Sequence, residues 1–326
     1  MASRDHERIL FLDGWRGMAI LTVLAAHFWL GNGNVGSLGV DLFFVLSGRL
    51  MAQILILEKF PLKSFFLRRF SRIYPVLFAF STVIFAASVA ASCRGYKFNS
   101  LVGPLDYLAA LTIWINYKIV YFGQAGALNH LWSISIEEHA YIILAALAAA
   151  FYRRRSIGWL IAALAIFALA NGVVRQLGGE GWVLLRTDVR IAPLFLSFAI
   201  RLGPEWLRKA MGLVAPLLLV LAYVMAFSDV PPVWQLVVNS VLLSVAVNGL
   251  DYASAIFRMP FEGGVMRFVG VTSYSLYIWQ QPFYTMHERV NPFILLFFAV
   301  AVAYGSYYVL EQPTRRYLNS KFSKVS

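Results

Sequence analysis

An arginine and a histidine on one hydrophobic segment are the residues best suited to chemistry. Arg16 and His27 lie eleven positions apart in the apolar segment that starts at Ile9. At 100° per residue, eleven positions make three helical turns with about 20° left over, so both side chains point the same way, roughly 16 Å apart along the axis. Such groups are costly inside a membrane and by default belong to a functional site. The imidazole is suited to removing a proton near neutral pH.

Structural roles compete with this interpretation. Arg16 could extend to lipid headgroups, or pair with Asp13 three positions earlier. His27 alone could be a buried structural histidine. The continuation of the stripe from Arg16 to His27 favours the functional alternative.

A second titratable cluster lies in the segment 129–141. His130 and Glu137 are seven positions apart, which places them on one face of a helix. Glu137 and Glu138 are adjacent, and two lipid-facing carboxylates would be costly, so at least one faces the interior of a helix bundle. We expect this end of the helix to lie at the same membrane depth as His27.

A basic, aromatic stretch covers residues 65–75. Arg69 and Arg72 are three positions apart and Arg68 and Arg72 are four apart, so they are neighbours on a helix. This pattern predicts an interfacial helix at the cytoplasmic surface that ends at Pro75. The arginines suit a lipid-anchoring patch and an anion site equally well.

Charged residues also interrupt the second apolar segment. Asp41 and Ser47 lie in apolar surroundings between Gly39 and Gly48. Arg49 is too near the middle of the segment for easy solvation, so we expect a buried carboxylate partner for it.

The composition is that of a polytopic helical membrane protein. The 326 residues are 60% hydrophobic and 13% charged, with a net charge of +12 and a mean hydropathy of +0.68. The basic excess is expected of cytoplasmic loops and needs no nucleic acid. A single cysteine excludes an internal disulfide framework and a cysteine-rich metal site, and the histidines lack metal-ligand spacing. No nucleotide-binding glycine motif is present.

Charge distribution sets the predicted topology. With the N-terminus inside and the segment 104–122 non-spanning or re-entrant, inside loops hold 19 lysines and arginines. Outside loops then hold seven, namely Arg94, Lys97, Lys118, Arg175, Arg186, Arg190 and Arg289. The positive-inside rule therefore favours about ten spans with both termini in the cytoplasm. We expect one all-α integral-membrane domain over 1–326, with no fused soluble domain. The predicted spans are 10–30, 36–57, 73–92, 131–151, 157–174, 188–201, 211–227, 232–250, 268–286 and 292–311.

Together these motifs resemble the membrane-bound acyltransferase 3 family, which covers bacterial O-acyltransferases of surface polysaccharides. The resemblance extends from about Arg8 to Pro313, and five motifs in the right order make it specific. His139 and Ala140 depart from it, because the family often has Gln-Phe there. The matching motifs are Asp13-Gly-Trp-Arg-Gly17 with His27, Gly39–Gly48, Arg69-Phe-Ser-Arg72, Trp132-Ser-Ile-Ser-Ile-Glu137, and the late Ser273–Trp279 and Glu311-Gln-Pro313.

The resemblance implies an acyl-CoA donor, most often acetyl-CoA, which enters from the cytoplasm. Arg69 and Arg72, and with them Arg68, offer forked donors for the CoA phosphates. Arg16 would lie deeper, near the pyrophosphate or the pantetheine arm. That arm is long enough to cover much of the distance from Arg16 to His27.

At the chemical step, His27 would take the proton of an acceptor hydroxyl. Glu137 would orient the imidazole and stabilise its charged form, and Asp41 could support either residue. Direct transfer and an acyl-histidine intermediate both fit the sequence. His130 is the alternative base, and His130, Trp132 and Asp13 complete the site as substrate-binding residues.

The expected protein is therefore a multi-pass enzyme of the bacterial inner membrane. It would acylate an extracytoplasmic carbohydrate, such as exopolysaccharide or lipopolysaccharide O-antigen, among membrane lipids and without nucleic acid or metal. A proton-coupled transporter or flippase for a lipid-linked sugar is the alternative, because buried Arg, His and Glu suit proton coupling equally well. Thioester turnover separates the two, since a transporter leaves acyl-CoA intact.

Overall fold

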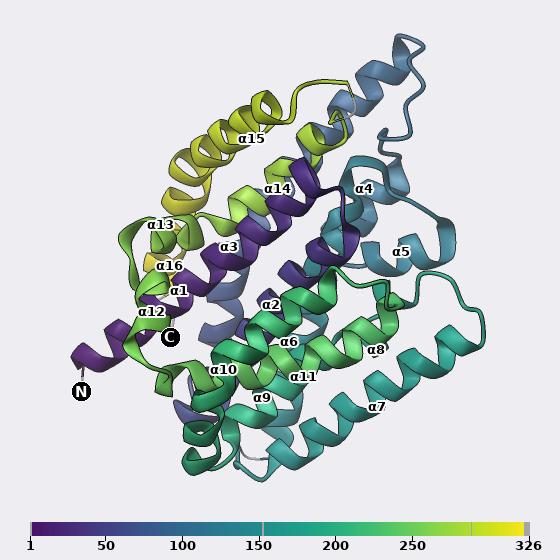
Figure 1. Ribbon diagram of the computed structural model, residues 1–326. Helices are drawn as coiled ribbons and strands as arrows, with labels where there is room; N and C mark the ends of the chain where they lie inside the picture. The colour runs from purple at the N-terminus through teal and green to yellow at the C-terminus, as the bar shows by residue number, and fades with distance from the viewer. Residues whose placement is uncertain (1, 152, 288, 323–326) are drawn as a thin grey trace. The chain divides into compact units, whose positions relative to one another are not determined.

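A computed structural model describes the backbone of residues 2–151, 153–287 and 289–322, with side chains from Phe11 onward (Figure 1). Every regular element in these ranges is a helix, which confirms the predicted all-α class. The chain divides into two compact units, each built from two stretches of sequence. Unit one comprises residues 1–59 and 139–273, and unit two comprises residues 60–138 and 274–326.

Unit one packs around α1, α2, α10 and α11. Trp15 and Leu42 are buried between them, and α10 turns a row of alanines to this core, including Ala215 and Ala222. In a membrane the hydrophobic effect does not drive helices together, so close packing must stabilise their contact. Small residues such as alanine allow the helices to approach closely enough for this packing. The elements are α1 (Ala2–Ala25), η1 (Ala26–Leu30), α2 (Gly33–Ala52), η2 (Gln53–Leu57), the end of α6 (Trp132–Ala150), α7 (Ile157–Leu177), η4 (Val183–Leu185), α8 (Thr187–Arg190), α9 (Ala192–Leu202), α10 (Glu205–Ala226), α11 (Pro232–Gly249), η5 (Leu250–Tyr252), α12 (Ala255–Glu262) and α13 (Gly264–Val271).

Unit two is built along α3, a helix of 32 residues. Antiparallel to it runs the start of α6, which crosses from unit two into unit one after Glu138. The elements are α3 (Leu62–Cys93), α4 (Pro104–Leu111), α5 (Ile115–Phe122), η3 (Gly126–Leu131), the start of α6, α14 (Ser273–Tyr284), α15 (Pro292–Ser306), η6 (Tyr307–Glu311) and α16 (Gln312–Phe322).

The prediction that the basic helix ends at Pro75 was wrong. Pro75 lies inside α3, which continues without a break to Cys93. A proline removes only its own N–H donor, and in membrane helices neighbouring groups compensate for that loss. The basic stretch and the apolar span after it are therefore one rigid element.

Within the described residues, seven helical segments are long and apolar enough to cross a membrane, and they correspond to seven of the ten predicted spans. The other three are assembled from pieces. Residues 10–30 cover α1 and η1, residues 188–201 are split between α8 and α9, and residues 268–286 are split between α13 and α14.

The segment 104–122 forms two helices of eight residues each, α4 and α5. At 1.5 Å per residue, neither is long enough to cross a bilayer. The polar residues that interrupt the segment bind one another, since Asp106 pairs with Lys118. Lys118 also donates to the carbonyls of Gly123 at 3.0 Å and Gln124 at 2.8 Å. The charges therefore fold the segment back on itself.

Large apolar side chains cover the outside of several helices. Trp159 on α7 is 85% exposed and Leu213 on α10 is 86% exposed. Phe297 on α15, in unit two, is also exposed. Apolar surfaces of this kind are suited to lipid contact, as the composition predicts.

Candidate functional site

The glycines of the Asp13–Gly17 motif lie where α1 contacts α12 and α13. A side-chain carbon at Gly14 would overlap the backbone carbonyl of Phe261, and one at Gly17 would overlap that of Met266. Glycine is needed at both positions because the helices approach backbone to backbone.

The tryptophan of the same motif anchors the helix. Trp15 is fully buried, and its ring stacks on Phe261 with the ring centroids 3.8 Å apart. On the partner helix, a side chain at Gly270 would overlap the carbonyl of Asp13. These contacts hold α1 in place and leave Arg16 half-buried beside them.

His27 lies in the one part of this stripe where the helix changes type. Residues Ala26–Leu30 form a π-helical turn that ends at Gly31 in the left-handed conformation, with φ of 59°. A π-helical turn is wider than an α-helical turn, so each residue in it rotates by a smaller angle about the axis. Only Ala26 and His27 are affected, so the direction of His27 relative to Arg16 changes by roughly a few tens of degrees. Single π turns in α-helices are frequent at functional sites.

The imidazole of His27 is half-buried and lies against α2. A side-chain carbon at Gly36 would be 3.7 Å from its Nε2 atom. The absence of a side chain on Gly36 therefore leaves space beside the ring nitrogen.

Asp41 belongs to a buried ion pair. Its Oδ1 atom is 2.9 Å from a terminal nitrogen of Arg190, and both side chains are almost completely buried. The same nitrogen of Arg190 donates to the Oγ of Ser37 at 2.5 Å. Ser37 follows Gly36, so this ion pair fixes the part of α2 that contacts His27.

Arg190 was not predicted as a site residue, because it was assigned to the outside loops. Arg190 is 1% exposed, and Lys118 and Arg201, also counted in loops, are buried as well. Its position inside the predicted span 188–201 was the available signal, since a charge within a span usually faces a partner. Removing these three residues from the loop counts leaves the excess of inside charge in place.

The partner of Arg49 is Asp251, which confirms the expected carboxylate, although Asp251 is half-buried and not fully buried. The two side chains are 2.5 Å apart. Arg49 also donates to the carbonyl of Val247 at 2.5 Å, and Arg201 approaches the same carboxylate at 3.8 Å. The charges join α2, α9 and η5 into one packed group.

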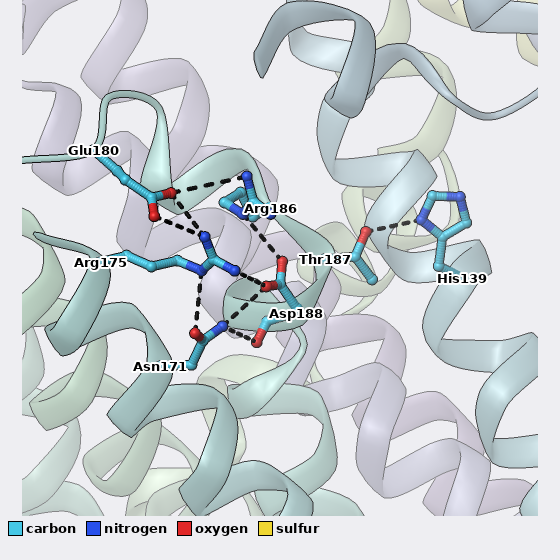
Figure 2. Close-up of polar contacts among 7 residues, drawn as sticks. All are labelled: His139, Asn171, Arg175, Glu180, Arg186, Thr187 and Asp188. Carbon is cyan, nitrogen blue, oxygen red and sulfur yellow. Dashed lines mark hydrogen bonds and ion pairs between the residues drawn. The ribbon is translucent and has the colours of Figure 1, made fainter. Parts of the chain in front are cut away.

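A further polar cluster of unit one surrounds Arg175 (Figure 2). Arg175 contacts both oxygens of Glu180 at 2.8 Å and lies 3.2 Å from Asp188. Beside the cluster, Nδ1 of His139 is 2.9 Å from the hydroxyl of Thr187. His139, where the family often has glutamine, therefore still makes a polar contact. The cluster links the end of α7 to α8.

In unit two, the three arginines of α3 have different surroundings. Arg68 is exposed, and its guanidinium lies over the ring of Phe60 at 4.6 Å. Arg69 is buried and lies 5.7 Å from the centre of the Phe65 ring. Arg72 is half-buried. Only Arg68 is fully open to a large anion, while the other two face the protein.

The motif arginines and the glutamates of α6 form one charged cluster. Both Arg69 and Arg72 act electrostatically on the carboxylate of Glu138, as does Glu137. From the sequence, the arginines were expected at the cytoplasmic surface and Glu137 near the outer side. The structure brings them together because α3 is continuous and α6 runs beside it.

His130 is buried among aromatic rings of unit two. Its ring centre is 5.5 Å from that of Phe80 and 5.4 Å from that of Tyr277. The Tyr277 hydroxyl donates to the carbonyl of His130 at 2.8 Å and lies 2.7 Å from the hydroxyl of Ser133. Trp132, which begins α6, is half-buried. These contacts give His130 a packing role.

The motif at Ser273–Trp279 ties the late helices to α3. The hydroxyl of Tyr274 donates to the carbonyl of Ile73 at 2.7 Å, and that of Ser275 donates to Glu311 at 2.6 Å. Glu311 opens the Glu-Gln-Pro motif and is buried. The two late motifs therefore bind each other.

Among the side chains that the structure describes, no group of three His, Cys, Asp or Glu residues could hold a metal ion. The arginines of α1 and α3 are the groups suited to an anionic ligand, because guanidinium matches phosphate with paired hydrogen bonds. His27 and Asp41 lie in unit one, and Glu137 lies in unit two. The pairing of Glu137 with His27 stays a prediction.

The family model described as "Acyltransferase domain" matches residues 9–310. The chain belongs to the acyltransferase 3 family. The match begins before Asp13 and ends one residue short of Glu311, so it includes His27 on α1 and the cluster of Arg69, Arg72 and the α6 glutamates. No solved structure is significantly similar to the chain.

Two relatives in the acyltransferase 3 family carry more specific names. "Putative peptidoglycan O-acetyltransferase YrhL" of Bacillus subtilis is 27% identical over 99% of this chain and 57% of its own length. "Peptidoglycan O-acetyltransferase OatA" of Listeria monocytogenes is 26% identical over 86% of this chain and 50% of its own length. The chain spans about half the length of the curated relatives it matches.

Proposed function

We propose that the chain is an integral-membrane O-acyltransferase that moves an acetyl group from cytoplasmic acetyl-CoA to a hydroxyl of an extracytoplasmic carbohydrate. Family membership over residues 9–310 is the observation that carries this proposal. The names of the relatives favour a cell-wall glycan as acceptor. Other acyl-CoA donors and other surface polysaccharides fit the same chemistry.

The topology we propose has about ten membrane crossings in the bacterial inner membrane, with both termini in the cytoplasm. The excess of lysine and arginine in the inside loops supports it. In this arrangement the first residues of α3, with Arg68, meet the cytoplasmic donor. The far end of α3 reaches the other side of the membrane.

Arginines of both units are suited to the donor. The exposed Arg68 would meet the nucleotide phosphates first, and Arg72 with Arg69 would extend the positive field inward. Arg16, held by the packing of its glycine motif, would bind the pyrophosphate or the pantetheine arm. Glu138 limits the cost of burying the motif arginines.

The proposed reaction is transfer of an acyl group from sulfur to oxygen. The acceptor hydroxyl oxygen bonds to the thioester carbonyl carbon, the carbon–sulfur bond breaks, and CoA leaves as the thiolate. His27 accepts the hydroxyl proton and passes it to that thiolate. Glu137 is the carboxylate that would stabilise the charged imidazole. If the reaction instead passes through an acyl-histidine intermediate, radiolabelled acetyl from acetyl-CoA would be found on the protein, which direct transfer does not predict.

The experiment compares free thiol release from acetyl-CoA by purified wild type and by His27→Ala, with an oligosaccharide acceptor present. We expect the variant to lose release by about 100-fold or more, the usual effect of removing a general base. His287→Ala is the matched control, because the contacts of His287 are with its chain neighbour Tyr284, whose carbonyl lies 2.8 Å from Nδ1 and whose ring stacks on the imidazole at 4.8 Å. Normal release by His27→Ala would reject its role. Transport of a lipid-linked sugar without any thiol release by wild type would favour the transporter alternative.

A further inference from the structure

The loop that follows α3 borders an open hollow of about 400 Å³. Residues between Ser92 and Leu101 line it, among them Tyr96, Lys97 and Asn99. None of these residues has a part in the acyl-transfer chemistry proposed above. A hollow of this volume is large enough for a sugar unit or a small oligosaccharide.

Two aromatic rings form one wall of this hollow. Tyr96 and Phe98 stack nearly parallel, with ring centroids 5.7 Å apart and an interplanar angle of 13°. Tyr96 is 55% exposed and Phe98 is 45% exposed, so ring surface stays accessible to a ligand. The C–H face of a pyranose ring is apolar and packs on surfaces of this kind.

Hydrogen-bonding groups surround the rings. Ser92, Lys97 and Asn99 line the same hollow, and the Ser92 hydroxyl donates to the carbonyl of Ser88 at 2.9 Å. The side chains of Lys97 and Asn99 carry donors and an acceptor of the kind that bind sugar hydroxyls and an acetamido group. An aromatic face beside polar side chains suits a carbohydrate.

The loop is held at both of its ends. The amide of Tyr96 donates to the carbonyl of Ala91 at 3.1 Å, which closes the end of α3. The amide of Val102 donates to the hydroxyl of Ser88 at 3.1 Å. A loop fixed in this way keeps its hollow before a ligand arrives, which lowers the entropy cost of binding.

The same loop is attached to the element that carries the His130 motif. The amide of Ala127 in η3 donates to the carbonyl of Ser100 at 3.0 Å. A side chain at Gly126 would overlap the carbonyl of Leu101, so the two segments touch backbone to backbone. The hollow is thus in direct structural contact with the segment that leads through His130 to Glu137.

The hollow lies at the far end of α3 from the motif arginines. From Arg72 to Ser92 there are twenty residues of continuous helix, or about 30 Å, which is the thickness of a bilayer core. If the arginines meet a cytoplasmic donor, the hollow opens on the opposite side of the membrane. An extracytoplasmic acceptor would arrive on that side.

We propose that this hollow is the acceptor subsite, where one pyranose ring of the glycan packs on Tyr96 and Phe98 and bonds to Lys97 and Asn99. The inference rests on the proposed function, because it names where that function takes its carbohydrate. Binding in the hollow holds the glycan strand next to η3 while a neighbouring sugar is acylated.

The test measures binding of chitotetraose, a soluble β-1,4-linked N-acetylglucosamine oligomer, to the full chain in detergent by saturation-transfer-difference NMR. Tyr96→Ala and Phe98→Ala should each raise the Kd about tenfold, as expected for the loss of one stacked ring. Asn99→Ala should weaken binding by a smaller factor. Phe122→Ala is the matched control, since Phe122 is an equally exposed aromatic of the same unit at another position and should leave the Kd unchanged.

Steady-state kinetics provide the second readout. Tyr96→Ala should raise the KM for the oligosaccharide and leave the KM for acetyl-CoA unchanged. Absence of chitotetraose binding to wild type, or equal binding by Tyr96→Ala and Phe122→Ala, would overturn the proposal. If the Tyr96 and Phe98 variants lose only thermal stability in lipid vesicles, the rings are a membrane anchor and the proposal fails. The NMR result does not depend on turnover, so failure of the acyltransferase proposal would be seen separately, as absent thiol release.

Discussion

Several buried charges in the described part of the chain form ion pairs, and these pairs limit which arginines can bind a ligand. Asp41 is neutralised by Arg190, and Arg49 is neutralised by Asp251. Asp41 is therefore more suited to positioning α2 than to chemistry, because its charge is already used. By contrast, Arg68 on α3 is exposed and available to an anion.

The buried Asp41–Arg190 ion pair should be important for the stability of the protein. Arg190→Ala would leave the Asp41 carboxylate buried without its counter-charge, and we expect the free energy of unfolding to fall by about 3–5 kcal/mol. Thermal unfolding of the purified protein in detergent measures this. Arg175→Ala is the control, because the Arg175 pair with Glu180 is far more exposed and should matter much less. Equal losses in the two variants would show that burial of Asp41 is not the cause.

At the scale of elements, the glycine-rich motif of α1 has a mechanical explanation. Gly14 and Gly17 let α1 touch α12 and α13, and Trp15 locks the contact by stacking on Phe261. The result is a rigid helix on which Arg16 has a fixed position. The π turn at its end gives His27 a separate orientation next to Gly36.

Packing of α13 on α1 is tested by substitution of its glycines. Gly270→Ala would drive a methyl group into the carbonyl of Asp13, and we expect about 1–3 kcal/mol of destabilisation from the forced backbone shift. Gly264→Ala, in the same helix, meets nothing within 4 Å and should be close to neutral. Unfolding midpoints of the two variants, measured side by side, decide the matter. A stable Gly270→Ala protein would mean that the helices can separate without cost.

On the scale of the whole molecule, acyl transfer across a membrane needs groups on both sides of it. Under the proposed function, α3 of unit two would serve both sides, with Arg68 near its start and the aromatic hollow beyond its end. α3 is continuous through Pro75, so both ends move as one body. α16 is tied to the first part of α3 by a 2.8 Å hydrogen bond between Asn319 and Ser71.

The proposed topology is tested with the single cysteine of the chain. Cys93 is exposed at the end of α3, so in intact cells it should react with a membrane-impermeant maleimide added from outside. A Cys93→Ser, Ser320→Cys variant moves the thiol to the exposed face of α16 and should react only after the cells are opened. Labelling in the reverse order would place the C-terminus outside and reject the positive-inside assignment.

The helical membrane class of the molecule and its motifs could be predicted from the sequence alone. Hydropathy gave the helical membrane fold, and the spacing of Arg16, His27, Arg69 and Arg72 with the other motifs gave the family. It also predicted a buried acid for Arg49, because the free-energy cost of an isolated buried charge depends only on its surroundings being apolar. These features are local, or repeat with the helical period, so they can be read along the chain.

The partners of the buried charges depend on tertiary packing. Asp251 pairs with Arg49, and Arg190 pairs with Asp41. Glu138 interacts electrostatically with Arg69 and Arg72. Each of these pairings depends on which helices pack together. The continuity of α3 through Pro75 could not be predicted, because a proline ends a helix or is tolerated according to what surrounds it. The hollow at Tyr96 is formed by backbone contacts between α3, the loop that follows it and η3. It could not be predicted, because these contacts leave no periodic pattern in the sequence.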